Sequence, residues 1–100
     1  MIKHIVMFKL KEANGKSEFE NALEAKARFD KVIENVKELK KGEVVINSAD
    51  APENNYTIAL LCDFENIDDL NAYQVHPIHK EFGTFIAEIK TDRACIDYEY

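Results

Sequence analysis

The order of strand-like and helix-like patterns along the chain restricts its fold more than any other feature of the sequence. Residues 2–11, 43–48, 56–64 and 93–100 have the alternation and the apolar content that are typical of strands. A long helical pattern separates the first of these segments from the second, and a shorter, interrupted one separates the third from the fourth. The sequence therefore predicts the order β-α-β-β-α-β.

The long helix is predicted from its start signal and from its apolar stripe. Ser17 followed by Glu20 is a capping box, in which the two side chains bond N–H groups that the first turn leaves free. Gly42 is the expected stop signal. The stripe, spaced by threes and fours, consists of Phe19, Ala22, Ala25, Phe29, Val32, Ile33, Val36 and Leu39. We expect this stripe to pack against the sheet.

The shorter helical region is predicted to form two helices. Asn66 can cap the first, and Pro77 interrupts the backbone hydrogen-bond ladder but suits the first turn of the second. The residues predicted to face inward are Ile67, Leu70 and Tyr73 in the first helix and His79, Phe82, Ile86 and Ile89 in the second.

The predicted order is that of the ferredoxin-like α+β fold, in which the helices cover one face of a four-stranded antiparallel sheet. We expect the first strand to lie between the third and the fourth, with the second strand at the far edge beside the third. Residues 1–100 are long enough for one hydrophobic core, so we expect them to form one domain.

The second face of such a sheet would carry apolar side chains with nothing to cover them. The residues predicted to lie there are Ile5, Met7, Ala59, Leu61, Ile96 and Tyr98. A contiguous apolar surface of this kind marks an interaction site, and a second copy of the same chain is the commonest way to cover it. We therefore expect a homodimer in which two sheets pack face to face as an α+β barrel.

Charge and hydropathy restrict the other partners. Nineteen acidic residues against thirteen Lys and Arg give a formal net charge of −6, which opposes binding to a phosphate backbone. No apolar stretch approaches the roughly 20 residues that span a bilayer. The first residues are strand-like and do not form a signal peptide. We expect a cytoplasmic protein that binds neither nucleic acid nor membrane.

The two cysteines do not have the spacing of metal ligands. Cys62 and Cys95 lie in separate strand-like segments, with the first strand expected between them, so we predict buried, reduced thiols. The sequence also has no glycine-rich phosphate loop, nucleophile elbow or flavin fingerprint. We therefore expect neither a metal nor a cofactor.

Four polar side chains are candidates for a site between the sheet and the helices. His79 lies on an apolar stripe, where burial would keep the imidazole neutral and able to accept a proton, and the Tyr73 hydroxyl also points inward. Antiparallel pairing of the fourth and first strands should bring Asp97 to His4. His4 is then either a histidine at the core edge whose hydrogen bonds Asp97 satisfies, or a pocket residue. His76 precedes a proline at a helix start and is interpreted as a capping or surface residue.

Three segments resemble the stress-responsive A/B barrel family, namely MIKHIVMFKL at 1–10, AYQVHPIH at 72–79 and IDY at 96–98. The most specific part is Tyr73 followed by HPIH at 76–79, with DFE at 63–65 before it and Phe82 after it. The resemblance covers essentially the whole chain. It implies a dimeric α+β barrel, in agreement with the topology predicted from the pattern.

The resemblance also implies an expectation about chemistry. A plant member of that family, olivetolic acid cyclase, closes a linear polyketide by aldol condensation with a tyrosine and histidine dyad, which Tyr73 and His79 match. His4 matches a pocket histidine of the same enzyme. Ile58 departs from the pattern, because it stands where the cyclase has another histidine.

Two functions remain open at this point. One is cofactor-free chemistry by proton abstraction next to a carbonyl, as in a lyase, aldol cyclase or isomerase, with His79 as base and Tyr73 as donor to the oxyanion. The other is a non-catalytic dimer that binds a small hydrophobic or aromatic ligand, or serves stress tolerance, without turnover. His4 and Asp97 assist the site in the first hypothesis.

Overall fold

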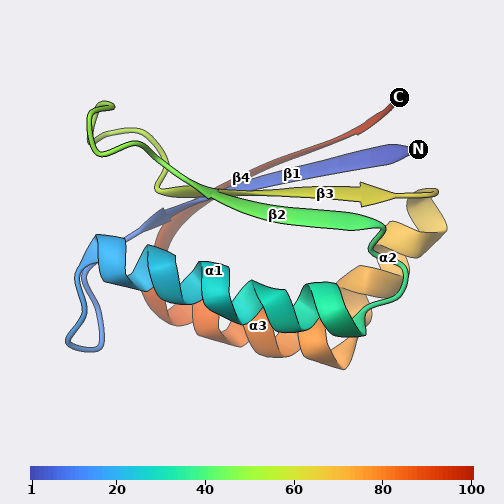
Figure 1. Cartoon of the computed structure of the whole chain (residues 1–100), viewed down its shortest axis with the longest axis horizontal. Coiled ribbons are helices and arrows are strands. Elements are labelled where there is room, and N and C mark those ends of the chain that lie inside the picture. The colour runs from blue at the N-terminus through green and yellow to red at the C-terminus, as the bar shows by residue number, and fades with distance from the viewer.

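A computed structural model describes all 100 residues of the chain as two layers, a sheet and a set of helices (Figure 1). The elements are β1 (Ile2–Leu10), α1 (Glu18–Asn35), β2 (Lys41–Ile46), β3 (Ile58–Phe64), α2 (Ile67–Val75), α3 (Pro77–Ile89) and β4 (Lys90–Glu99). The order predicted from the sequence is confirmed. No helix is both long and apolar enough to cross a membrane.

The sheet has the strand order β2-β3-β1-β4, as predicted, and every neighbouring pair is antiparallel. All three helices lie on one side of it, and the two chain ends meet at one end of the β1 and β4 pair (Figure 1). The Tyr100 N–H donates to the Met1 carbonyl there, over 3.0 Å. The fold is therefore ferredoxin-like.

The core lies between the sheet and the helices, because β1 and β3 alternate as predicted. On β1 the buried residues are Ile2, His4, Val6, Phe8 and Leu10, and on β3 they include Ile58, Leu60, Cys62 and Phe64. From the helices, Phe29, Val32, Phe82 and Ile86 pack against them. The Phe29 and Phe82 rings meet edge to face with centroids 5.1 Å apart, which joins α1 to α3.

The local start signals act as the sequence predicts. Ser17 and Glu20 form the complete capping box of α1, and the Asn66 side chain accepts from the Asp69 N–H at the start of α2. Pro77 occupies the first position of α3. The strand boundaries differ by a few residues from those predicted, since β2 begins earlier, β3 begins later, and β4 begins earlier and ends one residue sooner.

The prediction that α1 runs to Leu39 and stops at Gly42 is wrong. The helix ends at Asn35, and Val36 already has an extended backbone with φ of −102° and ψ of 98°. Val36 and Leu39 are still buried, but they belong to the connection to β2. Gly42 lies within β2, where a Cβ atom would come within 3.1 Å of Ile33. Glycine is needed at position 42 because β2 and α1 come close together there. In the sequence, a glycine with this role looks the same as one that ends a helix.

Two residues predicted to face inward do not. Phe19 is 59% exposed and Ile67 is 48% exposed, and both lie in the first turns of their helices. In the first turn of α1 the buried side chain is Asn21, whose amide donates to the carbonyls of Lys11 and Ala13 at 2.9 and 3.4 Å. The backbone carbonyls beside this first turn need hydrogen-bond donors. The buried position is therefore taken by the amide side chain of Asn21, and the Phe19 ring stays exposed.

The cysteines are free, as expected, and β1 separates their strands, but only Cys62 is buried. Burial raises the pKa of the Cys62 thiol to about 12. The prediction that Cys95 is buried is wrong, because β4 is an edge strand and the helices do not cover its side of the sheet fully.

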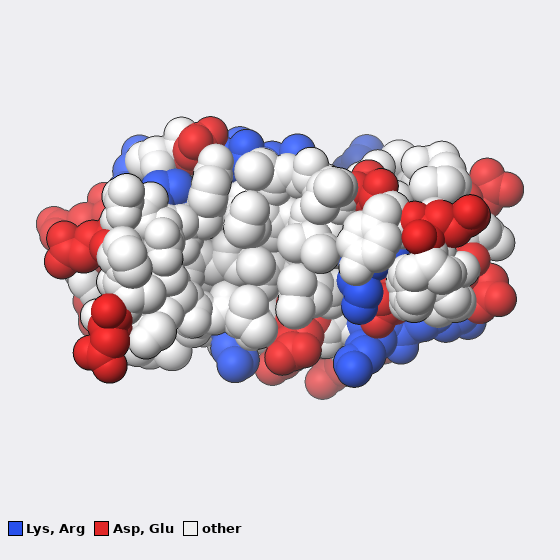
Figure 2. Space-filling view, turned by 90° about the horizontal axis from the view of Figure 1, so that it is seen from above, with Lys and Arg blue, Asp and Glu red and all other residues white.

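The open face of the sheet carries the predicted apolar residues. Figure 2 looks onto this face and shows a broad uncharged surface, with acidic and basic residues gathered mainly around it. Ile5, Met7 and Leu61 are partly buried there by their neighbours, while Ile96 and Tyr98 are 59% and 44% exposed. One acid on this face, Asp63, is almost buried under Lys3 at 2.6 Å and the Tyr100 hydroxyl at 2.7 Å.

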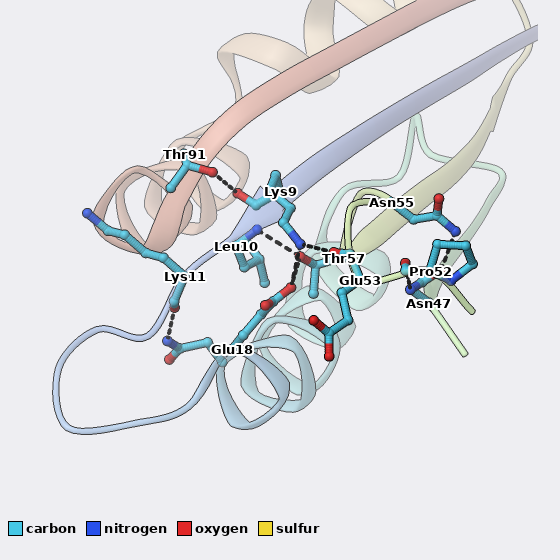
Figure 3. Close-up of polar contacts among 11 residues, drawn as sticks. Lys9, Leu10, Lys11, Glu18, Asn47, Pro52, Glu53, Asn55, Thr57 and Thr91 are labelled. Atoms are coloured by element: carbon cyan, nitrogen blue, oxygen red, sulfur yellow. Dashed lines mark hydrogen bonds and ion pairs between the residues drawn. The ribbon is translucent and has the colours of Figure 1, made fainter. Parts of the chain in front are cut away.

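A polar network ties the loop between β2 and β3 to the other layer (Figure 3). The Thr57 hydroxyl donates to Glu18 Oε2 at 2.6 Å and accepts from the buried Leu10 N–H at 2.8 Å. Lys9 Nζ donates to the same Glu18 oxygen at 3.1 Å and to the Glu53 carbonyl at 2.8 Å. The hydrogen bond from Thr57, and after it the bond and charge of Lys9, lower the pKa of Glu18 against the opposing effect of burial. The Glu18 carboxylate therefore keeps its charge.

Replacement of Thr57 by valine should test this network. The Leu10 N–H would lose its acceptor inside the protein, so we expect the free energy of unfolding in urea to fall by about 1 to 3 kcal/mol. Thr91→Val is the matched control, because the Thr91 hydroxyl makes only an exposed 3.3 Å bond to the Lys9 carbonyl. Equal losses for the two variants would show that Thr57 has no special place in the network.

Candidate active site

The four candidate side chains gather at a cavity between the sheet and α3. The cavity has a volume of about 410 Å³, within the usual range for small-molecule sites. It is lined by His4, Val6, Phe8, Leu60, Tyr73, Gln74, His79, Phe82, Gly83, Ile86, Lys90 and Arg93. Asp97 stands directly behind His4 without lining the cavity itself. Half of the lining residues are hydrophobic, and most of the others carry polar or charged side chains.

Tyr73 and His79 stand side by side although they belong to different helices. Tyr73 lies near the end of α2, and His79 lies in the first turn of α3, after the break at His76 and Pro77. Their ring centroids are 4.3 Å apart. The motif that stood out in the sequence therefore forms one contiguous polar pair on the cavity wall.

The Tyr73 hydroxyl has no hydrogen-bond partner although it is fully buried. Burial, together with the nearby Cys62 thiol, raises the pKa of the phenol well above its usual value. The group is therefore protonated at neutral pH and has a proton to donate. A buried polar group without a partner is rare in a folded protein and needs an explanation.

His79 is held in one tautomer by the backbone. Its Nδ1 donates to the Gln74 carbonyl at 3.2 Å, and because a carbonyl can only accept, Nε2 carries the free lone pair. Burial lowers the pKa of His79, against the opposing effect of the Gln74 bond, and the charges of His4, His76 and Arg93 lower it further. The imidazole is thus neutral near pH 7 and can accept a proton at Nε2.

His4 and Asp97 lie opposite one another in the pairing of β1 and β4, as predicted. His4 Nδ1 donates to Asp97 Oδ1, so Nε2 is the ring nitrogen of His4 that this bond does not use. The His4 ring is 3% exposed, and its centroid is 6.2 Å from that of Tyr73. The sequence left open whether His4 is a core-edge histidine bonded by Asp97 or a pocket residue. Both descriptions hold, because His4 is hydrogen-bonded to Asp97 and also lines the cavity.

His76 takes the capping position that was predicted for it. Its Nδ1 accepts from the Ile78 N–H at 3.1 Å, and the ring does not line the cavity. Three polar lining residues were not predicted from the sequence, namely Gln74, Lys90 and Arg93. Lys90 and Arg93 lie at the start of β4, where an exposed edge strand gives no apolar alternation to follow.

One group of side chains has the donor atoms of a metal site. His4, Cys95 and Asp97 offer a nitrogen, a sulfur and an oxygen within 4.8 Å of one another. In this arrangement Cys95 Sγ is 3.5 Å from His4 Nδ1, the nitrogen that already donates to Asp97. Burial and the Asp97 charge raise the pKa of the Cys95 thiol, which favours the protonated form over the thiolate that a metal requires.

Two larger hollows lie at the loop between β2 and β3, with volumes of about 660 and 460 Å³. Neither is lined by a histidine, and the first is edged by the Lys9 and Glu18 network of Figure 3. The smaller cavity at Tyr73 and His79 is thus the one that combines an apolar wall with proton-transferring groups.

The chain belongs to the stress-responsive A/B barrel family, whose domain model matches residues 2–100. A dimeric protein of unknown function and ferredoxin-like fold from Bacteroides fragilis is 37% identical, with 99% of this chain and 95% of that chain covered and a TM-score of 0.77. A dimeric ferredoxin-like protein of unknown function from Thermobifida fusca is 25% identical over 99% and 90% of the two chains, with a TM-score of 0.82.

The same fold occurs in an enzyme. The hydroxynitrile lyase of Passiflora edulis superposes with a TM-score of 0.77 over 97% of this chain and 90% of its own, at 18% identity. That level of identity shows a shared fold alone. No curated protein matches the chain by sequence.

Removal of the Tyr73 hydroxyl should cost the fold nothing. Because the group is buried without a partner, we expect Tyr73→Phe to leave the free energy of unfolding unchanged or to raise it by about 1 kcal/mol. Tyr100→Phe is the control, since the Tyr100 hydroxyl donates to Asp63 and its loss should destabilise. Urea unfolding of both variants at one protein concentration makes the comparison. A clear loss of stability for Tyr73→Phe would mean that the hydroxyl serves the fold.

Proposed function

We propose that this protein is a cofactor-independent enzyme that removes a proton from a carbon next to a carbonyl group, the first step of an aldol cyclase, a lyase or an isomerase. The observation that carries the proposal is the pairing of a free imidazole nitrogen with an unsatisfied, buried phenol in one cavity. The only polar neighbour of the Tyr73 hydroxyl is the Cys62 thiol, a weak hydrogen-bond partner, and the other ring nitrogen of His79 is the one bonded to the backbone.

The roles follow from the protonation states. Nε2 of His79 accepts the proton from the substrate carbon, and the electron pair of the broken C–H bond passes into the carbonyl group as an enolate. The Tyr73 hydroxyl donates a hydrogen bond to the oxyanion that forms. Its raised pKa fits a donor that keeps its proton throughout.

His4 and Asp97 form a second proton-handling pair on the sheet side of the cavity. Because Asp97 accepts from Nδ1 of His4, the carboxylate orients the ring and would stabilise a positive charge on it. We propose that His4 exchanges a proton with the far side of the substrate. In this way the site has one base on α3 and one on β1.

Two comparisons support this chemistry by analogy. Tyr73 and His79 match the dyad of a polyketide cyclase of the same family, and a hydroxynitrile lyase shares the fold. Ile58 stands where that cyclase has a histidine, and here it is buried in the core away from the cavity lining. We therefore assign a reaction class, proton abstraction next to a carbonyl, and not the cyclisation of a particular polyketide.

Deuterium exchange tests the proposal without the natural substrate. The acetyl protons of 4-acetylbenzoate should exchange with D₂O faster in the presence of the protein, and His79→Gln should remove about 100-fold or more of that catalysis. His76→Asn is the control, because it removes an imidazole outside the cavity and keeps a capping side chain. Proton NMR follows the loss of the methyl signal.

The acid limb of the exchange rate should report His79. Only the neutral ring accepts a proton, so catalysis persists down to the lowered pKa of His79 and is lost as the pH falls through it. Binding of the ketone with no exchange at any pH would favour the alternative, a ligand-binding or stress-tolerance protein without turnover.

We also propose that the protein is a homodimer that pairs through the open sheet face. The apolar surface in Figure 2 gives the physical reason, and the relatives from Bacteroides fragilis and Thermobifida fusca are described as dimeric. Strands of two copies would then enclose the residues that β1, β3 and β4 expose.

Charging this face should abolish the dimer. Leu61 lies at its centre, opposite Ile5, and Leu61→Glu would place an unpaired charge between the two sheets, so we expect a monomer by light scattering. Leu23→Glu is the control, because Leu23 is an exposed leucine on α1, in the other layer. A compact monomer for the unmodified protein at micromolar concentration would contradict the proposal.

A further inference from the structure

The cavity at Tyr73 and His79 carries positive charge and no negative charge. Two of its lining residues are cationic, Lys90 and Arg93, and no Asp or Glu lines it. The cavity therefore differs in sign from the chain as a whole, which has nineteen acids against thirteen Lys and Arg. A wall of one sign in an apolar cleft focuses the field on an ion of the opposite sign.

We propose that the cavity binds a ligand with a carboxylate group, which Arg93 and Lys90 hold while the ligand carbonyl lies at Tyr73 and His79. The proposal rests on the proposed function and names its substrate class, an oxo acid. Arg93 provides the planar fork that fits a carboxylate through two parallel hydrogen bonds.

Both cations lie on the helix-facing side of β4, in line with the site. Arg93 is paired with Phe8 and Lys90 with Leu10, and further along the same side Asp97 is paired with His4. The cationic part of the cavity wall is therefore close to Tyr73 and His79. Arg93 lowers the pKa of His79, as a nearby cation should. A ligand could reach from Arg93 to Tyr73 along the cavity wall.

No side chain of the protein neutralises these two cations. Neither Lys90 nor Arg93 takes part in an ion pair, whereas Lys3, Lys9, Lys16, Arg28 and Lys31 each do. The two acids closest to Arg93 along β4 have other partners: Asp92 accepts from the Tyr56 hydroxyl at 3.0 Å, and Asp97 accepts from His4. The guanidinium of Arg93 therefore has no acid of the protein as its partner, and its side-chain neighbour is the Cys95 thiol, a weak acceptor that an external anion can replace.

Three probes that share one scaffold test the assignment: 4-acetylbenzoate, 4-acetylbenzamide and 4-acetylphenyl phosphate. They differ only in the group that would meet Arg93. Binding to the full-length protein by calorimetry should be about tenfold or more tighter for the carboxylate than for the amide. Arg93→Gln should remove this preference, and Arg93→Lys should keep part of it. Lys26→Gln, at an exposed and unpaired lysine of α1, should leave the preference unchanged and controls for net charge.

The outcomes separate this inference from the proposed function. If the amide binds and exchanges its acetyl protons as well as the carboxylate does, the charge assignment is wrong and the proton-abstraction proposal stands. Arg93-dependent binding of the carboxylate without exchange supports the carboxylate site and contradicts catalysis. Tightest binding of the phosphate overturns the carboxylate assignment in favour of a phosphate ester. If none of the three binds, both proposals fail.

Discussion

The pairing of β1 with strands on both sides is the constraint on which the rest of the structure depends. β1 is hydrogen-bonded to β3 over one edge and to β4 over the other, so it joins the middle of the chain to its end. This pairing sets His4 opposite Asp97 on one side and opposite Cys62 on the other. A shift of one residue would turn His4 to the open face and separate it from the cavity. The site therefore depends on the register of the sheet.

That register is fixed by hydrophobic burial and could be read from the sequence. The alternation in β1 and β3 decides which face meets the helices, and the order of elements decides which strand is central. The encounter of Asp97 with His4 follows from these two facts alone. The sequence did not show how much of β4 the helices cover. Cys95 lies on the same face as His4, but it is exposed because β4 is the edge strand and the helices cover it only in part. The alternation of side chains along a strand predicts which side of the sheet each residue lies on. It does not predict how much of that side the helices bury.

The same limit explains the errors in the helices and in the site. Gly42 looked like a helix stop because glycine serves both to end helices and to admit close packing, and only the position of Phe29 and Ile33 against β2 decides between them. Arg93 and Lys90 were missed because a charged residue on an edge strand is by default solvated. Their significance comes from the cavity beside them, which no local pattern contains.

The break between α2 and α3 shows how a local rule produces the central pair of the site. In one continuous helix, Tyr73 and His79 would lie about 9 Å apart along the axis and would point in different directions. Pro77 cannot continue the helical ladder of α2, and His76 turns the backbone to an extended conformation with ψ of 134° before α3 restarts. The two rings then come within 4.3 Å, and the freed Gln74 carbonyl accepts from His79 and fixes its tautomer. The proline thus sets both the distance between the two groups and the nitrogen of His79 that can act as a base.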